Sequence, residues 1–192
     1  MSKLVSPVRN PRPTGSRPRA RSRENTRKRP GSRRISNGVI RSISETRRLA
    51  RRVSRSLLAR KRRPIILALS GALGSGKTAF AQGLAAALGI RERIQSPTFV
   101  LMKWYGLGKK FLPYRHLVHV DAYRIARLAE ARHLGLPAVF SDRDAIVVVE
   151  WAERIRKLVP RSAVWVQFKH RRSPRERIFE FKMQNAKLKT KA

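Results

Sequence analysis

The segment Gly71–Thr78 reads GALGSGKT and matches the phosphate-binding pattern G-x-x-x-x-G-K-T. Five apolar residues, 65–69, precede it as a buried strand would, and residues 79–88 follow with good helix formers such as alanine and leucine. Gly89 then stands where a glycine commonly ends a helix. A strand, a glycine loop and a helix in this order predict a binding site for the phosphates of a nucleoside triphosphate.

The residue types in this loop explain the expected chemistry. Glycines let the backbone curl so that successive N–H groups point toward a phosphate, and the start of the next helix adds partial positive charge. Lys77 adds a full charge toward the β- and γ-phosphates, and the Thr78 hydroxyl is placed to ligate Mg²⁺. A glycine-rich turn with a chance lysine is the alternative, which the flanking elements disfavour. The residues expected to bind the nucleotide here are Gly71, Leu73, Gly74, Ser75, Gly76, Lys77, Thr78 and Ala79.

The chain is strongly basic, with 46 Lys and Arg against 11 Asp and Glu and a formal net charge of +35. Residues 1–63 carry 22 basic and 2 acidic side chains (+20), and residues 64–192 carry the other 24 and 9 (+15). A field of this sign attracts polyanions such as RNA, although charge alone gives no sequence specificity. A solvated basic surface without a nucleic-acid partner is the other interpretation.

Two absences from the sequence limit the function. The chain has no cysteine, which excludes disulfides, zinc–thiolate sites and thiol catalysis. No apolar run approaches the roughly 18 residues that a membrane-spanning helix needs, and no signal-peptide pattern follows the first residues. We therefore expect a soluble, cytoplasmic protein that does not use a membrane.

Composition divides the chain into one domain and two tails. Residues 1–38 are rich in Arg, Ser and Pro and lack apolar periodicity, which predicts a disordered basic tail. A transit peptide is the alternative, but four prolines in the first 18 residues oppose its usual amphipathic helix. Residues 39–185 form the expected P-loop ATPase domain, and residues 186–192 form a short basic tail.

A helix is expected from Ser44, which can cap it, with Glu45 complementing the helix dipole. Apolar side chains recur on one face between residues 49 and 57, and arginines occupy the opposite face. We interpret this pattern as a buried apolar stripe under a solvated basic face, and a dedicated RNA-binding helix is the alternative.

Two further apolar runs each end in a carboxylate. Residues 117–121 end at Asp121, and residues 145–150 end at Glu150. Such runs are typical of strands buried in a largely parallel sheet, whose ligands gather at the carboxyl ends of the strands. We therefore expect Asp121 and Glu150 to converge near Thr78 and the metal, one of them as the Walker B type carboxylate. A strand-end acid in solvent is the alternative for each.

Three other residues between the acids and the loop have open roles. His119 lacks any partner at metal-ligand spacing, so we expect a structural histidine, or one that supports a ligand, rather than a metal ligand. Thr98 lies in the turn Ser96-Pro97-Thr98, which can order around a γ-phosphate; a plain Ser-Pro turn is the alternative. Trp151 can pack either in the core or beside the nucleotide.

The remaining patterns complete an α/β fold. Residues 125–134 have helical composition and are followed by Gly135, which offers a stop. The β-like runs at residues 163–168 and 177–183 predict an antiparallel hairpin. The predicted architecture is a three-layer P-loop NTPase with a mainly parallel central sheet and an antiparallel C-terminal edge hairpin.

Five motifs follow one another in an order that is far more specific than any of them alone. They are Gly71–Thr78, Ser96-Pro97-Thr98-Phe99, His119-Val120-Asp121-Ala122-Tyr123-Arg124, Leu134-Gly135-Leu136 and Val149-Glu150-Trp151. Residues 44–183, which contain them, resemble the TsaE family, also called YjeE, of small bacterial P-loop ATPases. The resemblance implies a Mg²⁺-dependent ATPase that acts with the TsaB and TsaD proteins. Its implied task is threonylcarbamoylation of adenosine 37 in tRNAs reading ANN codons.

The resemblance also implies residue roles and shows departures from the family pattern. The implied catalytic residues are Lys77, Asp121 and Glu150; the implied Mg²⁺ ligands are Thr78, Asp121 and Glu150; and Thr98 and Trp151 join the ATP-binding residues. The family usually has Asp where this chain has Ala72, and a more acidic stretch at residues 129–133. The basic N-terminal tail lies outside the family pattern.

Two other functions fit parts of the sequence. The phosphate loop alone also fits a small-molecule kinase, whose arginine-rich lid could come only from residues 171–175. The basic tail and helix fit a tRNA-binding module with secondary ATPase activity. The sequence leaves open which carboxylate ligates Mg²⁺ directly and whether hydrolysis drives chemistry or product release. Thr46 and Arg175 are the candidates for contacts with adenine.

Overall fold

The computed structural model describes residues 38–59, 64–92, 94–95, 100–170 and 179–184. The strands are β1 (Gly38–Ile40), β2 (Ile65–Ser70), β3 (Met102–Gly106), β4 (His116–Asp121), β5 (Ala145–Glu150), β6 (Val164–His170) and β7 (Phe179–Gln184). The α-helices are α1 (Ile43–Leu58), α2 (Lys77–Ala87), α3 (Leu128–His133) and α4 (Leu136–Ser141), and the short 3₁₀ helices are η1 (Lys109–Phe111) and η2 (Ala152–Ile155).

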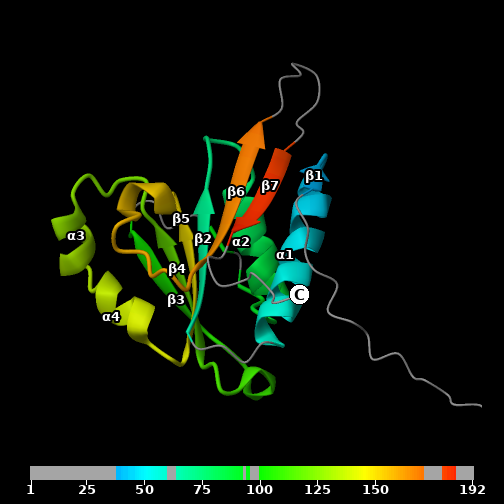
Figure 1. Cartoon of the computed structure of the whole chain (residues 1–192). Helices are drawn as coiled ribbons and strands as arrows, with labels where there is room; N and C mark the ends of the chain where they lie inside the picture. The colour runs from blue at the N-terminus through cyan, green and yellow to red at the C-terminus, as the bar shows by residue number, and fades with distance from the viewer. Residues whose placement is uncertain (1–37, 60–63, 93, 96–99, 171–178, 185–192) are drawn as a thin grey trace, which may run out of the picture. The chain divides into compact units, whose positions relative to one another are not determined.

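The described strands form one seven-stranded sheet in the order β1-β7-β6-β2-β5-β4-β3. The four central strands, β6, β2, β5 and β4, are parallel, while the outer pairs are antiparallel. Helices α1 and α2 cover one face of the sheet, and α3 and α4 cover the other (Figure 1). The predicted three-layer fold, with its antiparallel C-terminal hairpin, is confirmed, and the short strand β1 pairs with the outer side of that hairpin.

The central strands are buried on both faces because aliphatic side chains point to both layers. Leu67 and Leu69 of β2 join a cluster with the helices α1 and α2. Ile66 and Ala68, the residues between them, join a second cluster with α3 and α4. A strand with period-two side chains and two apolar faces can be stable only inside such a three-layer structure.

Helix α1 begins two residues earlier than expected, so the prediction of Ser44 as its cap was wrong. Ser42 has extended backbone geometry, and its hydroxyl accepts a hydrogen bond from the Glu45 N–H at 3.1 Å. Ser44 already lies inside the helix. The apolar stripe is buried as expected, with Leu49, Val53 and their neighbours packed against α2 and the sheet, while the arginines remain exposed.

The segment between the two acidic strands also differs from expectation. Helix α3 covers only residues 128–133 of the predicted helix at 125–134. Gly135 has a positive φ of 74° and starts a second helix, α4, rather than only ending the first. Pro137 at the start of α4 fits because the first turn of a helix needs no backbone donor there.

Several sequence predictions fall outside the described residues. They concern the turn at residues 96–99, the arginine cluster at 171–175, the C-terminal tail at 186–192 and all of the N-terminal tail except Gly38, which begins β1.

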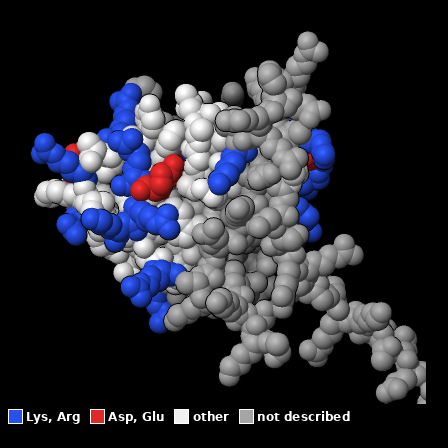
Figure 2. Space-filling model, turned by 45° about the horizontal axis from the view of Figure 1, so that its top comes forward, with Lys and Arg blue, Asp and Glu red and all other residues white. Residues whose placement is uncertain are grey.

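Basic side chains cover much of the described surface. Figure 2 shows Lys and Arg gathered on the side that carries α3 and α4 in Figure 1, with a small acidic patch among them. The exposed basic residues of α3, η2 and the segments beside them are Arg124, Arg127, Arg132, Arg154, Arg156 and Lys157. Within the described ranges, no helix is both long and apolar enough to cross a membrane.

Replacing Ser42 by alanine should lower the free energy of unfolding by about 0.5–2 kcal/mol, because the Glu45 N–H would lose its acceptor. The matched Ser44→Ala change should cost less than about 0.5 kcal/mol, since Ser44 caps no helix N–H in the described structure. Denaturant midpoints at constant m-value measure both. Equal losses would contradict the cap assignment.

Candidate nucleotide-binding site

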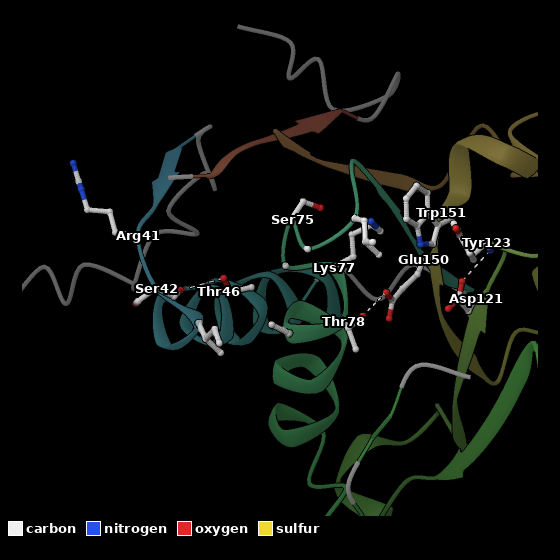
Figure 3. Close-up of a pocket in the computed structure, with 15 residues that line it drawn as sticks. Arg41, Ser42, Thr46, Ser75, Lys77, Thr78, Asp121, Tyr123, Glu150 and Trp151 are labelled. Atoms are coloured by element: carbon white, nitrogen blue, oxygen red, sulfur yellow. Dashed lines mark hydrogen bonds between the residues drawn. The ribbon is translucent and has the colours of Figure 1, made fainter. Parts of the chain in front are cut away.

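A cavity of about 680 Å³ opens at the carboxyl end of the central strands, around the Gly71–Thr78 loop (Figure 3). One end is formed by the junction between β1 and α1, and the other by residues that follow β4 and β5. The lining residues are Arg41, Ser42, Ile43, Thr46, Leu73, Gly74, Ser75, Gly76, Lys77, Thr78, Ala79, Asp121, Tyr123, Glu150 and Trp151. A volume of this size suits a nucleotide-sized ligand.

The loop leaves β2 through a turn that only glycine can make. Gly71 has a φ of +134°, and a Cβ placed on it would lie 2.3 Å from the carbonyl oxygen of Phe168 on β6. Its N–H donates to Glu153 Oε1 at 3.2 Å. The start of the loop therefore packs against β6 and is hydrogen-bonded to η2, the segment that follows β5.

Lys77 folds back over its own loop. Its Nζ donates to the carbonyl oxygens of Gly71 at 2.6 Å and Ala72 at 2.9 Å, and it lies 3.7 Å from the centroid of the Trp151 ring. Burial lowers the pKa of Lys77 from its usual 10.5, while three neighbouring carboxylates oppose that shift. A bound phosphate would favour the charged ammonium in the same way.

A chain of hydrogen bonds runs from the loop into the sheet. The Thr78 hydroxyl donates to Glu150 Oε2 at 2.7 Å, and the other carboxylate oxygen, Oε1, lies 2.8 Å from His119 Nε2. Both partners in the second contact are buried in the sheet. Beside them, Asp121 Oδ1 accepts from the Tyr123 N–H at 2.9 Å (Figure 3).

Strand register brings the two carboxylates together. Asp121 lies opposite Glu150 in the parallel pair β4–β5, and Leu69 lies opposite Glu150 in the pair β2–β5. Both acids and Thr78 line the same cavity. Hydroxyl and carboxylate oxygens are the ligands that Mg²⁺ prefers, and this ion commonly takes its other ligands from phosphates and water. Among the described residues, no group of three or more His, Cys, Asp or Glu side chains could hold a metal ion by itself.

Trp151 adopts an uncommon backbone conformation directly after Glu150. Its φ of 56° lies in the left-handed region, which costs a residue other than glycine about 1–3 kcal/mol. The ring is partly buried; it covers Lys77 and packs at 5.0 Å and a tilt of 48° against the Tyr123 ring. The side chain thus packs against the core cluster on the α3 and α4 side of the sheet and also lies beside the phosphate loop, while its contact with a nucleotide stays a prediction.

Other predicted residues have mixed outcomes. Thr46 lines the cavity, and its side chain would approach a Cβ on Gly76 within 3.7 Å. Arg175 and Thr98 lie outside the described residues. Ala72 is exposed, and its backbone carbonyl oxygen accepts a hydrogen bond from Lys77 Nζ. This contact does not depend on the side chain at position 72.

Sequence reasoning missed three parts of the site. Tyr123 lies two residues beyond Asp121, and Glu153 three beyond Glu150, so proximity to the predicted acids could have found them. No sequence pattern pointed to the residues Arg41–Ile43, because they reach the cavity only through the packing of α1 beside α2. Figure 3 shows the Arg41 side chain pointing away from the loop.

A family model described as "Threonylcarbamoyl adenosine biosynthesis protein TsaE" matches residues 40–178. The chain belongs to the TsaE family. Proteins named tRNA threonylcarbamoyladenosine biosynthesis protein TsaE are among its relatives. That of Mycobacterium tuberculosis H37Rv is 36% identical over 142 residues, which are 69% of this chain and 80% of the relative. That of Treponema pallidum is 36% identical over 104 residues, 54% of this chain and 72% of the relative.

A solved structure has the same fold. The crystal structure of Bacillus subtilis YdiB is similar with a TM-score of 0.55 and 29% sequence identity, and the match covers 76% of this chain and 82% of that one. The resemblance to the TsaE family is confirmed by the family model and by these relatives.

Gly71→Ala should destabilise the protein by roughly 2–5 kcal/mol, because the new Cβ would clash with backbone and the left-handed φ would be strained. Gly74→Ala is the matched control, since Gly74 also has a positive φ, +71°, but open space around its Cβ. It should cost only about 1–2 kcal/mol. Thermal and denaturant unfolding measure both changes. A Gly71→Ala loss no larger than that of Gly74→Ala would contradict the packed turn.

Proposed function

We propose that this TsaE-family protein is a Mg²⁺-dependent ATPase and an accessory subunit for threonylcarbamoylation of adenosine 37 in tRNAs reading ANN codons, acting in the cytoplasm with TsaB and TsaD. The observation that carries the ATPase part is the 2.7 Å contact between the Thr78 hydroxyl and Glu150 at the end of the phosphate loop. The tRNA part is supported by family membership, since the relatives are named for this biosynthesis.

The chain's own groups would divide the work in the following way. The N–H groups of the loop and Lys77 would bind the phosphates, with Lys77 exchanging its two carbonyl partners for phosphate oxygens. Thr78, Glu150 and Asp121 would hold Mg²⁺, which neutralises charge on the β- and γ-phosphates when bound. The Thr78 contact supports a metal-side role for Glu150. Asp121 would orient the attacking water in addition to serving the metal.

An apolar rim around the cavity supports a protein partner at this site. Six large apolar side chains are exposed in the described part of the chain, and three of them line the cavity: Ile43, Leu73 and Tyr123. Leu73, at the tip of the phosphate loop, is 78% exposed. Apolar side chains that converge on one opening are typical of docking surfaces. TsaB and TsaD are the proposed partners, and their docking here would cover the nucleotide.

ATP hydrolysis should be slow and Mg²⁺-dependent, and it should rise when TsaB and TsaD are added. Lys77→Ala and Glu150→Ala should lower the rate by about 100-fold or more, because each removes a group that stabilises transferred-phosphate charge or the metal. Arg132→Ala, on the exposed face of α3, serves as the control and should keep the wild-type rate. Release of phosphate is measured with and without partners, and wild-type rates in both variants would contradict the assignment.

A small-molecule kinase is the second candidate for the same loop. It would transfer the γ-phosphate to a metabolite or nucleoside, and its arginine-rich lid would have to come from residues 171–175. The same assay separates the two, because a kinase forms a phosphorylated acceptor from a panel of nucleosides and metabolites. Free phosphate alone supports the ATPase.

tRNA contact through the basic N-terminal tail is also part of the proposal. Residues 1–38 contain 12 Lys and Arg and one acidic residue. Deleting them should weaken tRNA binding. The slope of log affinity against log salt concentration should also become less steep, by about 0.7–0.9 for each phosphate contact that is lost. The matched control neutralises Arg127, Arg132 and Lys157 on the folded surface and should change the slope less. Binding is measured by fluorescence anisotropy from 50 to 200 mM salt (about a fourfold range); equal binding by truncated and full-length protein would rule the tail out.

A further inference from the structure

His119 is a buried polar side chain in an otherwise aliphatic strand. It lies in β4 between Val118 and Val120 and has no exposed surface. Its Nε2 lies 2.8 Å from Glu150 Oε1, and no described residue forms a hydrogen bond with its Nδ1. The only polar contact of this ring within the described structure is therefore the one to Glu150.

This arrangement is unfavourable for stability alone. An aliphatic side chain like those on either side would fill the sheet without burying a polar nitrogen, whereas an imidazole with one unpaired nitrogen is costly to bury. The compensating feature is the Glu150 carboxylate, which is itself 2% exposed and needs partners for both oxygens. His119 forms a hydrogen bond with Oε1, and the Thr78 hydroxyl donates one to Oε2.

We propose that His119 is a positioning residue: its Nε2–H holds Oε1 of Glu150, so that Oε2 stays directed at the Thr78 hydroxyl and the Mg²⁺ site. The proposal rests on the proposed ATPase function and adds a specific residue to it. It predicts that His119 acts through Glu150 and makes no contact with nucleotide.

Lys77 offers the Glu150 carboxylate a competing attraction. Of the three carboxylates whose charge acts on Lys77, Glu150 has the largest effect. A carboxylate released from His119 would be drawn toward the Lys77 ammonium, which lines the same cavity. The hydrogen bond from His119 to Oε1 prevents the Glu150 carboxylate from rotating toward Lys77, so that Lys77 stays available to bind phosphate.

The test uses full-length protein and ADP binding measured by calorimetry with and without Mg²⁺. His119→Leu removes the donor but suits an aliphatic strand, and His119→Gln keeps an N–H donor near the position of Nε2. We expect His119→Leu to leave metal-free ADP affinity within about twofold and to reduce the Mg²⁺-dependent gain in affinity by about 10- to 100-fold. His119→Gln should restore most of that gain.

Two further variants show whether the effect passes through Glu150. In a Glu150→Gln background, His119→Leu should cause no additional loss of the Mg²⁺-dependent gain, because His119 acts on the metal only through the carboxylate that this background lacks. The matched control is His116→Leu, on the same strand, whose Nε2 bonds a different carboxylate, Asp142, at 2.6 Å. This control should keep the Mg²⁺-dependent gain within about twofold.

The outcomes are distinct. A His119→Leu protein with an unchanged Mg²⁺-dependent gain overturns the positioning role. Equal loss of metal-free and Mg²⁺-dependent binding also overturns it, because that result marks a structural defect. Additive losses in the Glu150→Gln background would do the same. If the wild-type protein binds no ADP, the proposed function is overturned and this inference with it. If the wild-type protein binds ADP more tightly with Mg²⁺, the variants test the positioning role of His119 separately from the proposed function.

Discussion

The hydrogen bond between Thr78 and Glu150 joins residues that are 72 positions apart, and the rest of the site depends on what brings them together. The cause is the parallel pairing of β2 with β5, in which Leu69 lies opposite Glu150. Parallel strands end at the same edge of a sheet, so the loop that leaves β2 meets the acid that ends β5. The next parallel pair brings Asp121 to the same edge.

The N-terminal helix completes the cavity because it packs unusually close to the helix that starts at the phosphate loop. A Cβ on Gly83 of α2 would lie 2.8 Å from the Arg47 Cα of α1. This approach brings Thr46 next to the turn at Gly76 and places Ser42 at the cavity wall. The basic helix therefore has a structural task on its buried face, whatever its exposed arginines bind.

Electrostatic attraction acts on Lys77, and backbone strain is present in Trp151, whose ring covers it. The ammonium is partly desolvated, it is attracted by three carboxylates, and its present partners are carbonyls of its own loop. Trp151 covers it from a strained left-handed backbone position that follows Glu150 directly. Trp151 thus follows Glu150 directly in the chain and contacts Lys77 through its ring, and strained backbone of this kind clusters at functional sites.

Local sequence patterns were enough to predict the phosphate loop between strand and helix, the acids that end two buried strands, and the three-layer α/β class. Local patterns could not locate contacts made across the sheet. The shared carboxylate of Glu150, the tryptophan over Lys77 and the N-terminal wall of the cavity were decided by tertiary structure alone. Strand register and helix packing, rather than distance along the chain, determine which side chains meet.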